Sequence, residues 1–155
     1  MSSITIRYQI PEAEWRRSAE RRWEPEEEPI GDLFDGDVAI FVSGESIFDA
    51  ETYPISISNL AVGLVSVYTS LEAGQNGEFK FYQINDGLTM IFVVEGEHVR
   101  VSHNLASGRE WHASRAEVLV GFSTFIKSFS EEVRARVPEG LDWKQLRRLK
   151  EYAKH

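Results

Sequence analysis

The segment of residues 114–140 restricts the fold more than any other part of the sequence. Ser114 and Glu117 have the S-x-x-E spacing of a capping box, which predicts that a helix begins there. Two arginines follow in the expected last turn, and Pro138 ends the pattern. The stripe along this helix is apolar and consists of Val118, Phe122, Phe125, Ile126, Phe129 and Val133. Burying it contributes on the order of 10 kcal/mol before entropy is subtracted, so we expect this helix to pack on a sheet.

Residues 78–103 predict that sheet as an antiparallel meander. Three apolar runs, "EFKFYQI", "LTMIFVV" and "HVRVSHN", are separated by "NDG" and "EGE". Glycine supplies the positive φ that tight hairpin turns require. The middle run has apolar residues on both faces of the predicted strand. We therefore expect it at the centre of the sheet, partly covered on both sides.

The other segments alternate between strand and helix patterns. Val38, Ile40 and Val42 share one face of a predicted hairpin with its turn at "SGE". A helix is predicted between Ser58 as N-cap and Gly74 as C-terminal stop. The remaining predictions are a strand over 3–10, a helix over 12–23, an exposed loop at "EPEEEP" and a basic amphipathic helix over 142–154.

Together these elements indicate one α+β domain over residues 1–155. We expect a mainly antiparallel sheet of five to six strands, packed against two or three helices. The length suits one domain, and no linker, repeat or low-complexity tract divides the chain.

Composition excludes several classes of protein. The chain has no cysteine, which removes disulfides, thiolate metal sites and cysteine nucleophiles and suits a reducing compartment. Its first residues lack the basic start and apolar run of a secretory signal, and "LTMIFVV" is far too short to span a bilayer. We therefore expect a cytoplasmic protein without membrane association.

The charge distribution says more than the formal net charge of −8. From Glu24 to Glu97 there are fifteen acidic residues and one basic residue, whereas the rest of the chain has a net charge of +6. An acidic field repels nucleic acid and attracts cationic partners, although it also simply promotes solubility. The candidate partner-binding residues are Glu26, Glu27, Glu28, Asp32, Asp35, Asp37, Glu45 and Asp49.

No pattern indicates catalysis, a metal or a cofactor. His98 and His103 lie five positions apart in one predicted strand and so point to opposite faces, which prevents them from sharing a metal ion there. His112 is expected in the loop before the long helix, and His155 is the last residue. Acids at hairpin turns are usually solvated, and no nucleophile-elbow, P-loop or dinucleotide-binding motif occurs. We expect a protein that is not an enzyme and that binds no nucleic acid.

The stretch "EWRRSAERRW" has two interpretations. Trp15 and Trp23 fall on one helical stripe, where the simplest outcome is burial against the sheet with arginine side chains covering their edges. Tryptophan and arginine together are also typical interface anchors. Nucleic-acid binding by this helix would be opposed by the acidic segment that follows it.

The order of elements over about residues 37–130 resembles small bacterial immunity proteins of polymorphic and contact-dependent toxin systems. The segments that carry the resemblance are "GDVAIFVSGESIF", "PISISNLAVGLVSVYTSLE", "FKFYQINDGLTMIFVVEGEHVRVSHN" and "AEVLVGFSTFIKSF". The resemblance implies a non-catalytic inhibitor that binds one toxin domain. Many toxins are cationic nucleases, and an acidic surface would speed the encounter with such a partner.

Two alternatives stay open. One is a small-ligand-binding or enzymatic domain with a site between the sheet and the long helix, near Tyr82, His98 and Arg100. The other is an oligomerising module that uses Trp143 and Leu146 as a dimer seam, so that both a monomer and a homodimer remain possible.

Overall fold

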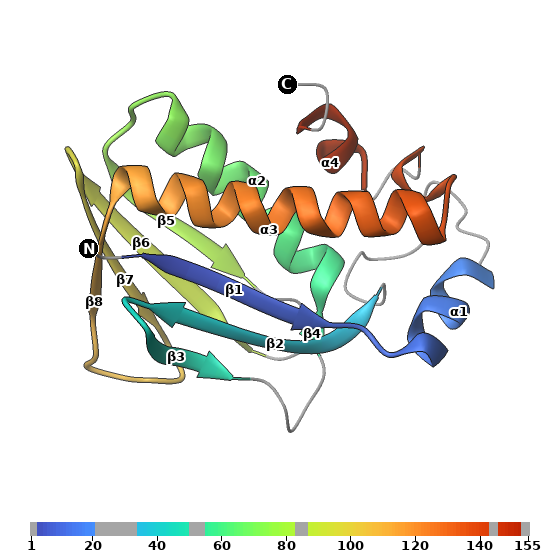
Figure 1. Cartoon of the computed structure of the whole chain (residues 1–155). Coiled ribbons are helices and arrows are strands. Elements are labelled where there is room, and N and C mark those ends of the chain that lie inside the picture. The colour runs from blue at the N-terminus through green and yellow to red at the C-terminus, as the bar shows by residue number, and fades with distance from the viewer. Residues whose placement is uncertain (1–2, 21–33, 50–54, 83–86, 143–145, 153–155) are drawn as a thin grey trace.

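The computed structural model describes residues 3–20, 34–49, 55–82, 87–142 and 146–152. Within these ranges the chain forms two antiparallel β-sheets of four strands each and four α-helices (Figure 1). The α+β class and the antiparallel pairing are confirmed, but the expectation of a single five- to six-stranded sheet is wrong. Periodicity indicates which residues face the core, whereas it does not indicate which strands pair with one another.

The first sheet is built from β1 (Ile4–Gln9), β2 (Asp35–Val42) and β3 (Glu45–Asp49) in the order β1-β2-β3. The short strand β4 (Ile55–Ser56), which the sequence pattern does not predict, pairs with the start of β2. The predicted hairpin is confirmed, because Val38, Ile40 and Val42 are buried. Ser43 and Gly44 form its turn, both with positive φ (51° and 82°), as tight hairpin turns require.

The second sheet has the order β5 (Gly77–Tyr82), β6 (Thr89–Glu95), β7 (His98–His103) and β8 (Trp111–Ser114). The predicted meander is confirmed, and β6 lies inside the sheet. Strand β8 corrects the sequence analysis, which placed His112 in a loop. Four residues carry too little alternation to predict a strand, although Trp111 and Ala113 are buried and His112 between them is exposed.

The four helices are α1 (Glu12–Glu20), α2 (Ile57–Glu72), α3 (Arg115–Arg136) and α4 (Arg147–Tyr152), with a 3-10 turn at Gly140–Asp142. The predicted cap of α3 is confirmed, because Ser114 Oγ accepts a hydrogen bond from the Glu117 amide at 3.2 Å. Helix α2 begins earlier than expected. Its N-cap is Ser56, which accepts from the Asn59 amide at 3.2 Å, whereas Ser58 is already inside the helix.

Helix α3 joins the two sheets through its apolar stripe. All six predicted stripe residues are buried. Phe122 meets Phe92 of β6 edge to face at 5.4 Å, and Phe125 and Phe129 meet Tyr8 of β1 at 5.5 and 5.9 Å between ring centroids. Edge-to-face pairs of this kind stabilise the fold beyond the contribution from the apolar area that they bury. One helix therefore supplies core contacts to both sheets.

Two glycines allow helices and strands to approach closely. A Cβ atom on Gly121 of α3 would lie 2.3 Å from the carbonyl oxygen of Ile4 in β1. A Cβ atom on Gly63 of α2 would lie 2.1 Å from the ring of Phe81 in β5. Both distances are far below van der Waals contact, so these positions exclude any larger residue unless a neighbour moves.

Two buried polar side chains, His103 and Arg115, form hydrogen bonds between different secondary-structure elements. His103 Nε2 lies 2.6 Å from the Ile47 carbonyl oxygen and connects β7 with β3 across the two sheets. Arg115 is 8% exposed and donates to the carbonyl oxygens of Leu71 and Gly96, each at 2.8 Å. It thereby binds the C-terminal end of α2, where a cation is favoured by the helix dipole.

The structure bears on two predictions, the role of Trp15 and Trp23 and the dimer seam at Trp143 and Leu146, for one residue of each pair. Trp15 is 4% exposed, packs on Phe34 at 5.1 Å and has the Arg136 guanidinium over its ring at 5.1 Å, so it belongs to the core. Leu146 is fully buried within the chain, which leaves it unavailable for a dimer seam. Trp23 and Trp143 lie outside the described residues.

Candidate functional site

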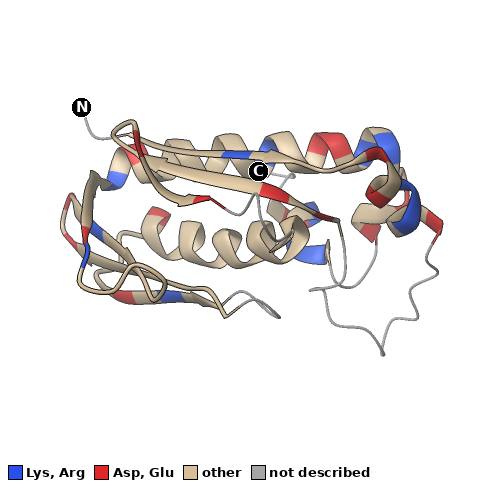
Figure 2. Ribbon diagram, turned by 90° about the horizontal axis from the view of Figure 1, so that it is seen from below, with Lys and Arg blue, Asp and Glu red and all other residues tan. Residues whose placement is uncertain are grey.

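The face of the first sheet that points away from α3 carries the described part of the predicted acidic surface. Alternate residues of β1, β2 and β3 project there because strand side chains alternate between faces. Figure 2 shows strands of this sheet in front of α3, with no helix in front of them. We call this surface the outer face of the first sheet; it consists of Thr5, Arg7, Gln9, Asp35, Asp37, Ala39, Phe41, Ser46 and Asp49.

Two predicted acids come together on this outer face. Asp49 of β3 pairs with Ala39 of β2, which places Asp37 diagonally across from Asp49 on the same side. Diagonal neighbours in antiparallel sheets are about 7–8 Å apart, and both side chains are exposed. Among the described residues no ion pair involves Asp37. Asp37 therefore contributes negative charge to this face, beside the exposed side chain of Asp49.

Asp35 lies at the end of the same strand, with part of its charge compensated. Its carboxylate is 4.0 Å from Arg17 Nη2 of α1, and its backbone amide donates to Glu14 Oε1 at 3.1 Å. Arg17 also binds the Glu14 carboxylate at 2.5 Å. Helix α1 thus contributes a small charge network beside the outer face, and Asp35 adds less to the field than Asp37 does.

Glu45 does not join this cluster. It lies at the other end of the β2–β3 hairpin, where Arg109 Nη2 donates to it at 2.5 Å and Trp111 Nε1 at 3.2 Å. These contacts neutralise its charge and attach the hairpin to β8. Glu26, Glu27, Glu28 and Asp32 lie outside the described residues.

The space between the second sheet and α3 is filled by the core. Phe92 and Phe122 are both fully buried there and pack edge to face, at the place that the small-ligand alternative assigns to its site. Tyr82, His98 and Arg100 instead lie on the opposite, outer face of this sheet, where Tyr82 is 63% exposed. These three residues therefore do not face the long helix, contrary to the expectation.

The outer face of the second sheet contains a histidine pair that the sequence analysis missed. His112 Nδ1 lies 3.0 Å from His98 Nε2, and the two rings stack at 5.0 Å between centroids. The hollow around the pair is also lined by Glu95 and Glu97. The pair could have been predicted only from the register between β7 and β8. Arg100 pairs with His112, and His98 lies two residues before Arg100, so both histidines are on one face of the sheet.

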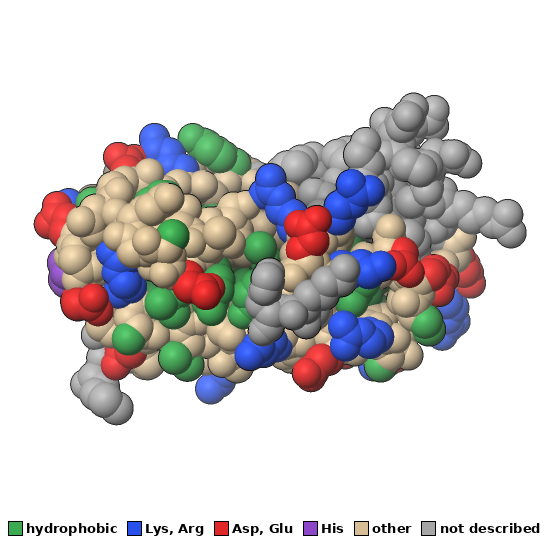
Figure 3. Space-filling view, turned by 90° about the horizontal axis from the view of Figure 1, so that it is seen from above, with side chains coloured by type: hydrophobic (Ala, Val, Ile, Leu, Met, Phe, Trp, Pro, Cys, Tyr) green, Lys and Arg blue, Asp and Glu red, His purple; other side chains and the backbone are tan. Residues whose placement is uncertain are grey.

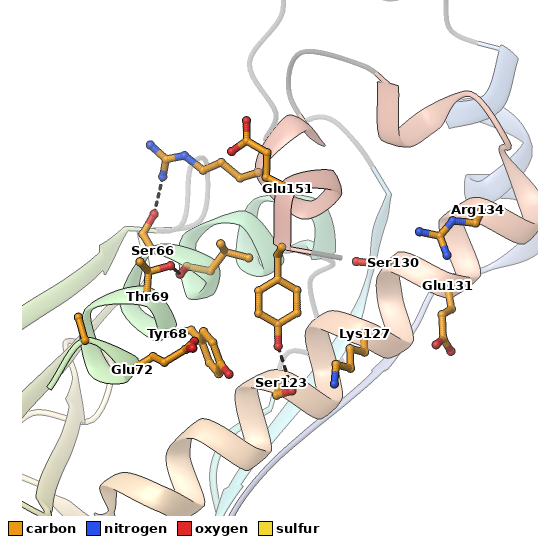
Figure 4. Close-up of a pocket in the computed structure, with 14 residues that line it drawn as sticks. Ser66, Tyr68, Thr69, Glu72, Ser123, Lys127, Ser130, Glu131, Arg134 and Glu151 are labelled. Atoms are coloured by element: carbon orange, nitrogen blue, oxygen red, sulfur yellow. Dashed lines mark hydrogen bonds between the residues drawn. The ribbon is translucent and has the colours of Figure 1, made fainter. Parts of the chain in front are cut away.

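A groove of about 980 Å³ lies between α2, α3 and α4 (Figure 4). Across it Tyr152 Oη donates to Ser123 Oγ at 2.9 Å, and Arg148 binds Ser66 Oγ. In Figure 3 basic and acidic side chains are interspersed on this side of the molecule. The polar lining combines hydroxyl groups with three basic and three acidic side chains: Ser66, Tyr68, Thr69, Glu72, Ser123, Lys127, Ser130, Glu131, Arg134, Arg148, Glu151 and Tyr152.

Two groups in this groove are unusual. Ser130 is 2% exposed, and its hydroxyl oxygen has no hydrogen-bond partner. Burial, followed by the nearby Tyr152 phenol and Glu72 carboxylate, raises the pKa of Tyr68 to about 12. An unpartnered buried hydroxyl loses hydrogen bonds with water and gains none in return. A polar ligand in the groove would reach the Ser130 hydroxyl after a shift of the lining side chains that cover it.

No protein-family model matches the sequence, and searches of curated proteins and of solved structures find no significant match. No helix in the described part of the chain is both long and apolar enough to cross a membrane. Those same residues contain no group of three or more His, Asp or Glu side chains that could hold a metal ion. Function has to be inferred from the surface chemistry of the molecule itself.

Proposed function

We propose that the protein is a non-catalytic binding domain that docks a cationic protein on the outer face of the first sheet. The observation that carries this proposal is the pair of exposed carboxylates, Asp37 and Asp49, held on neighbouring strands. Half-buried Ala39 and Phe41 lie between the exposed polar residues of the same face. An apolar centre with a polar, charged rim is the usual anatomy of a protein–protein interface.

The sharpest form of the proposal is an immunity-type inhibitor of a toxin domain. A cationic nuclease domain has the charge that this face attracts, and complementary charge raises the association rate far above that of neutral partners. Arg7 also lies on the face, with its guanidinium 5.1 Å from the Phe41 ring centroid. A partner that fits would therefore present basic groups opposite Asp37 and Asp49 and an acceptor opposite Arg7.

The test first asks whether the gene immediately upstream encodes a protein with a C-terminal toxin domain. If it does, the association rate of that domain with the purified chain is measured. We expect the rate to fall steeply with added salt and by at least about tenfold in the double variant Asp37→Asn/Asp49→Asn. A matched control is Glu78→Gln/Glu139→Gln, which removes the same charge from exposed positions outside the face. A salt-independent rate, or equal loss in both double variants, would refute docking on this surface.

The groove between α2, α3 and α4 favours a second candidate function, the binding of a small polar molecule. The specific observation is the buried, unpartnered Ser130 hydroxyl in a groove of about 980 Å³. A screen of polar metabolites by thermal shift should find a compound that raises the Tm of the wild type and raises that of Ser130→Ala less. A compound that stabilises both proteins equally would place its site elsewhere.

A further inference from the structure

The histidine pair of the second sheet has the spacing of a metal chelate. Zinc–nitrogen bonds are about 2.0–2.1 Å long, so two cis imidazole nitrogens on one ion are about 2.8–3.4 Å apart for bond angles between 90° and tetrahedral. His98 Nε2 and His112 Nδ1 are 3.0 Å apart. We infer that these two nitrogens form a bidentate site for a divalent transition-metal ion.

The backbone holds the two rings in this relation. His98 pairs with Ser114, and His112 pairs with Arg100, so the histidines are diagonal neighbours across the β7–β8 ladder. Both positions are in regular strands, and both side chains are exposed. Ligands on paired strands are positioned more precisely than ligands on loops, which reduces the ordering that metal binding requires.

Metal binding needs a change of tautomer in this pair and a rotation of the exposed rings, because the two nitrogens that now face each other have to point at one ion. In the metal-free protein one facing nitrogen carries the proton of an N–H···N hydrogen bond, and the other accepts it. Coordination requires a lone pair on each, so that proton leaves its nitrogen, and the same ring takes up a proton on its other nitrogen from solvent. Exposure of both rings makes this exchange possible without opening the core.

The surrounding charges favour a cation. Glu95 is paired in register with His98, and Glu97 lines the same hollow. Arg100 pairs in register with His112 and is a positive charge on this face, and its guanidinium lies 3.7 Å from the carboxylates of both Glu95 and Glu110. An acidic surrounding raises the local concentration of cations.

The donor set selects the kind of ion. Imidazole nitrogen suits zinc, copper and nickel, whereas magnesium and calcium prefer oxygen ligands. With two protein ligands, water molecules occupy the other coordination positions, as at open rather than structural zinc sites. This inference concerns a different surface from the docking proposal and does not depend on it.

The experiment is a calorimetric titration of the tag-free full chain with zinc chloride, in parallel with NMR of the histidine ring protons. We expect one equivalent of zinc to bind, with the His98 and His112 ring signals shifting and the buried His103 signals unchanged. His98→Gln and His112→Gln should each weaken binding by at least about tenfold, because either change breaks the chelate. Magnesium chloride should produce no saturable binding.

His155→Gln is the control, since it removes an imidazole outside the pair. It should bind zinc like the wild type, and circular dichroism should show that all variants keep their folded spectra. Absence of saturable zinc binding to the wild type would overturn the inference. So would retention of full affinity in either His98→Gln or His112→Gln, or an equal loss of affinity in His155→Gln.

Discussion

Helix α3 has two sides that are covered in different ways. Toward β1 the contact is close, because Gly121 admits the carbonyl oxygen of Ile4 and the Phe125 and Phe129 rings meet Tyr8. Toward α4 the same helix borders a groove of about 980 Å³ lined by side chains such as Lys127. One helix therefore combines a tightly packed side with a side that borders a groove.

The difference shows how the chain separates stability from surface chemistry. On the packed side Ser18 Oγ accepts the Phe34 amide at 3.1 Å. On the groove side Ser130 Oγ is buried without a hydrogen-bond partner. Substitutions on the packed side should therefore destabilise the protein, whereas those on the groove side should leave its stability nearly unchanged.

The largest effect is expected for Phe129→Ala. Its ring is fully buried and meets both Tyr8 and Phe34 at 5.9 Å between centroids, so truncation leaves a cavity in the packed side. The free energy of unfolding, measured with urea, should fall by about 3–5 kcal/mol. Val120→Ala is the control on the same helix, since Val120 is 66% exposed and should change stability by less than about 0.5 kcal/mol. Similar losses in the two variants would contradict the packing described.

Gly121→Ala should have the next largest effect. Its new methyl group meets a backbone oxygen, so β1 itself has to move, and the overpacking exceeds the roughly 1 kcal/mol that alanine gains over glycine in a helix. We expect a net loss of about 2 kcal/mol by chemical denaturation. Gly63→Ala is the matched variant in α2, where the obstructing group is the Phe81 ring. A ring can adjust more easily than a strand, so we expect Gly63→Ala to lower the free energy of unfolding by less than Gly121→Ala does. A larger loss in Gly63→Ala would contradict this expectation.

The two buried serines give a smaller and more direct comparison. Ser18→Ala leaves the Phe34 amide without its acceptor and should cost about 1–3 kcal/mol. Ser130→Ala removes a hydroxyl with no partner and should change stability by less than about 0.5 kcal/mol. Thermal denaturation of both variants measures the difference. A substantial loss in Ser130→Ala would mean that its hydroxyl is bonded in solution and would weaken the case for ligand binding in the groove.

The smallest effect concerns alkaline pH. The pKa of Tyr68 is raised to about 12, first by burial and then by Tyr152 and Glu72, whereas an unfolded tyrosine has a pKa of about 10. The folded state therefore holds this proton more tightly, and its stabilising effect is present below pH 10 and lost as the pH rises toward about 12. Tyr68→Phe should reduce the fall in unfolding free energy over this interval. An unchanged pH dependence in the variant would contradict the raised pKa.

Sequence periodicity predicted the parts of the fold in which one face is buried. The stripe of α3, the inner residues of β2 and the cap at Ser114 all follow from spacing and local hydrogen bonding. The division into two sheets could not be predicted in this way, because strand partners depend on packing between distant segments. Strand β8 was missed for a further reason: its four residues are recognisable only beside β7.

The candidate surfaces were predictable to a smaller extent. Asp37 and Asp49 were expected to share a surface, and the hairpin register brings them onto one face. Glu45 was predicted to join them as an acid of the same hairpin, but it forms an ion pair with Arg109, which lies in a loop whose position no local pattern indicates. The His98–His112 contact depends on β8. Because this short strand was not predicted, the contact between the two histidines was not predicted either.

The contact between Ile4 and Gly121 also bears on how the chain is synthesised. Its two partners lie 117 residues apart in the sequence, so β1 leaves the ribosome long before the helix that covers it. During that interval the inner side of β1 is a nascent hydrophobic strand that a chaperone could hold. Chains truncated before α3 should accordingly stay sensitive to protease over residues 3–20 and 34–49, and resistance there should appear only when α3 has been completed.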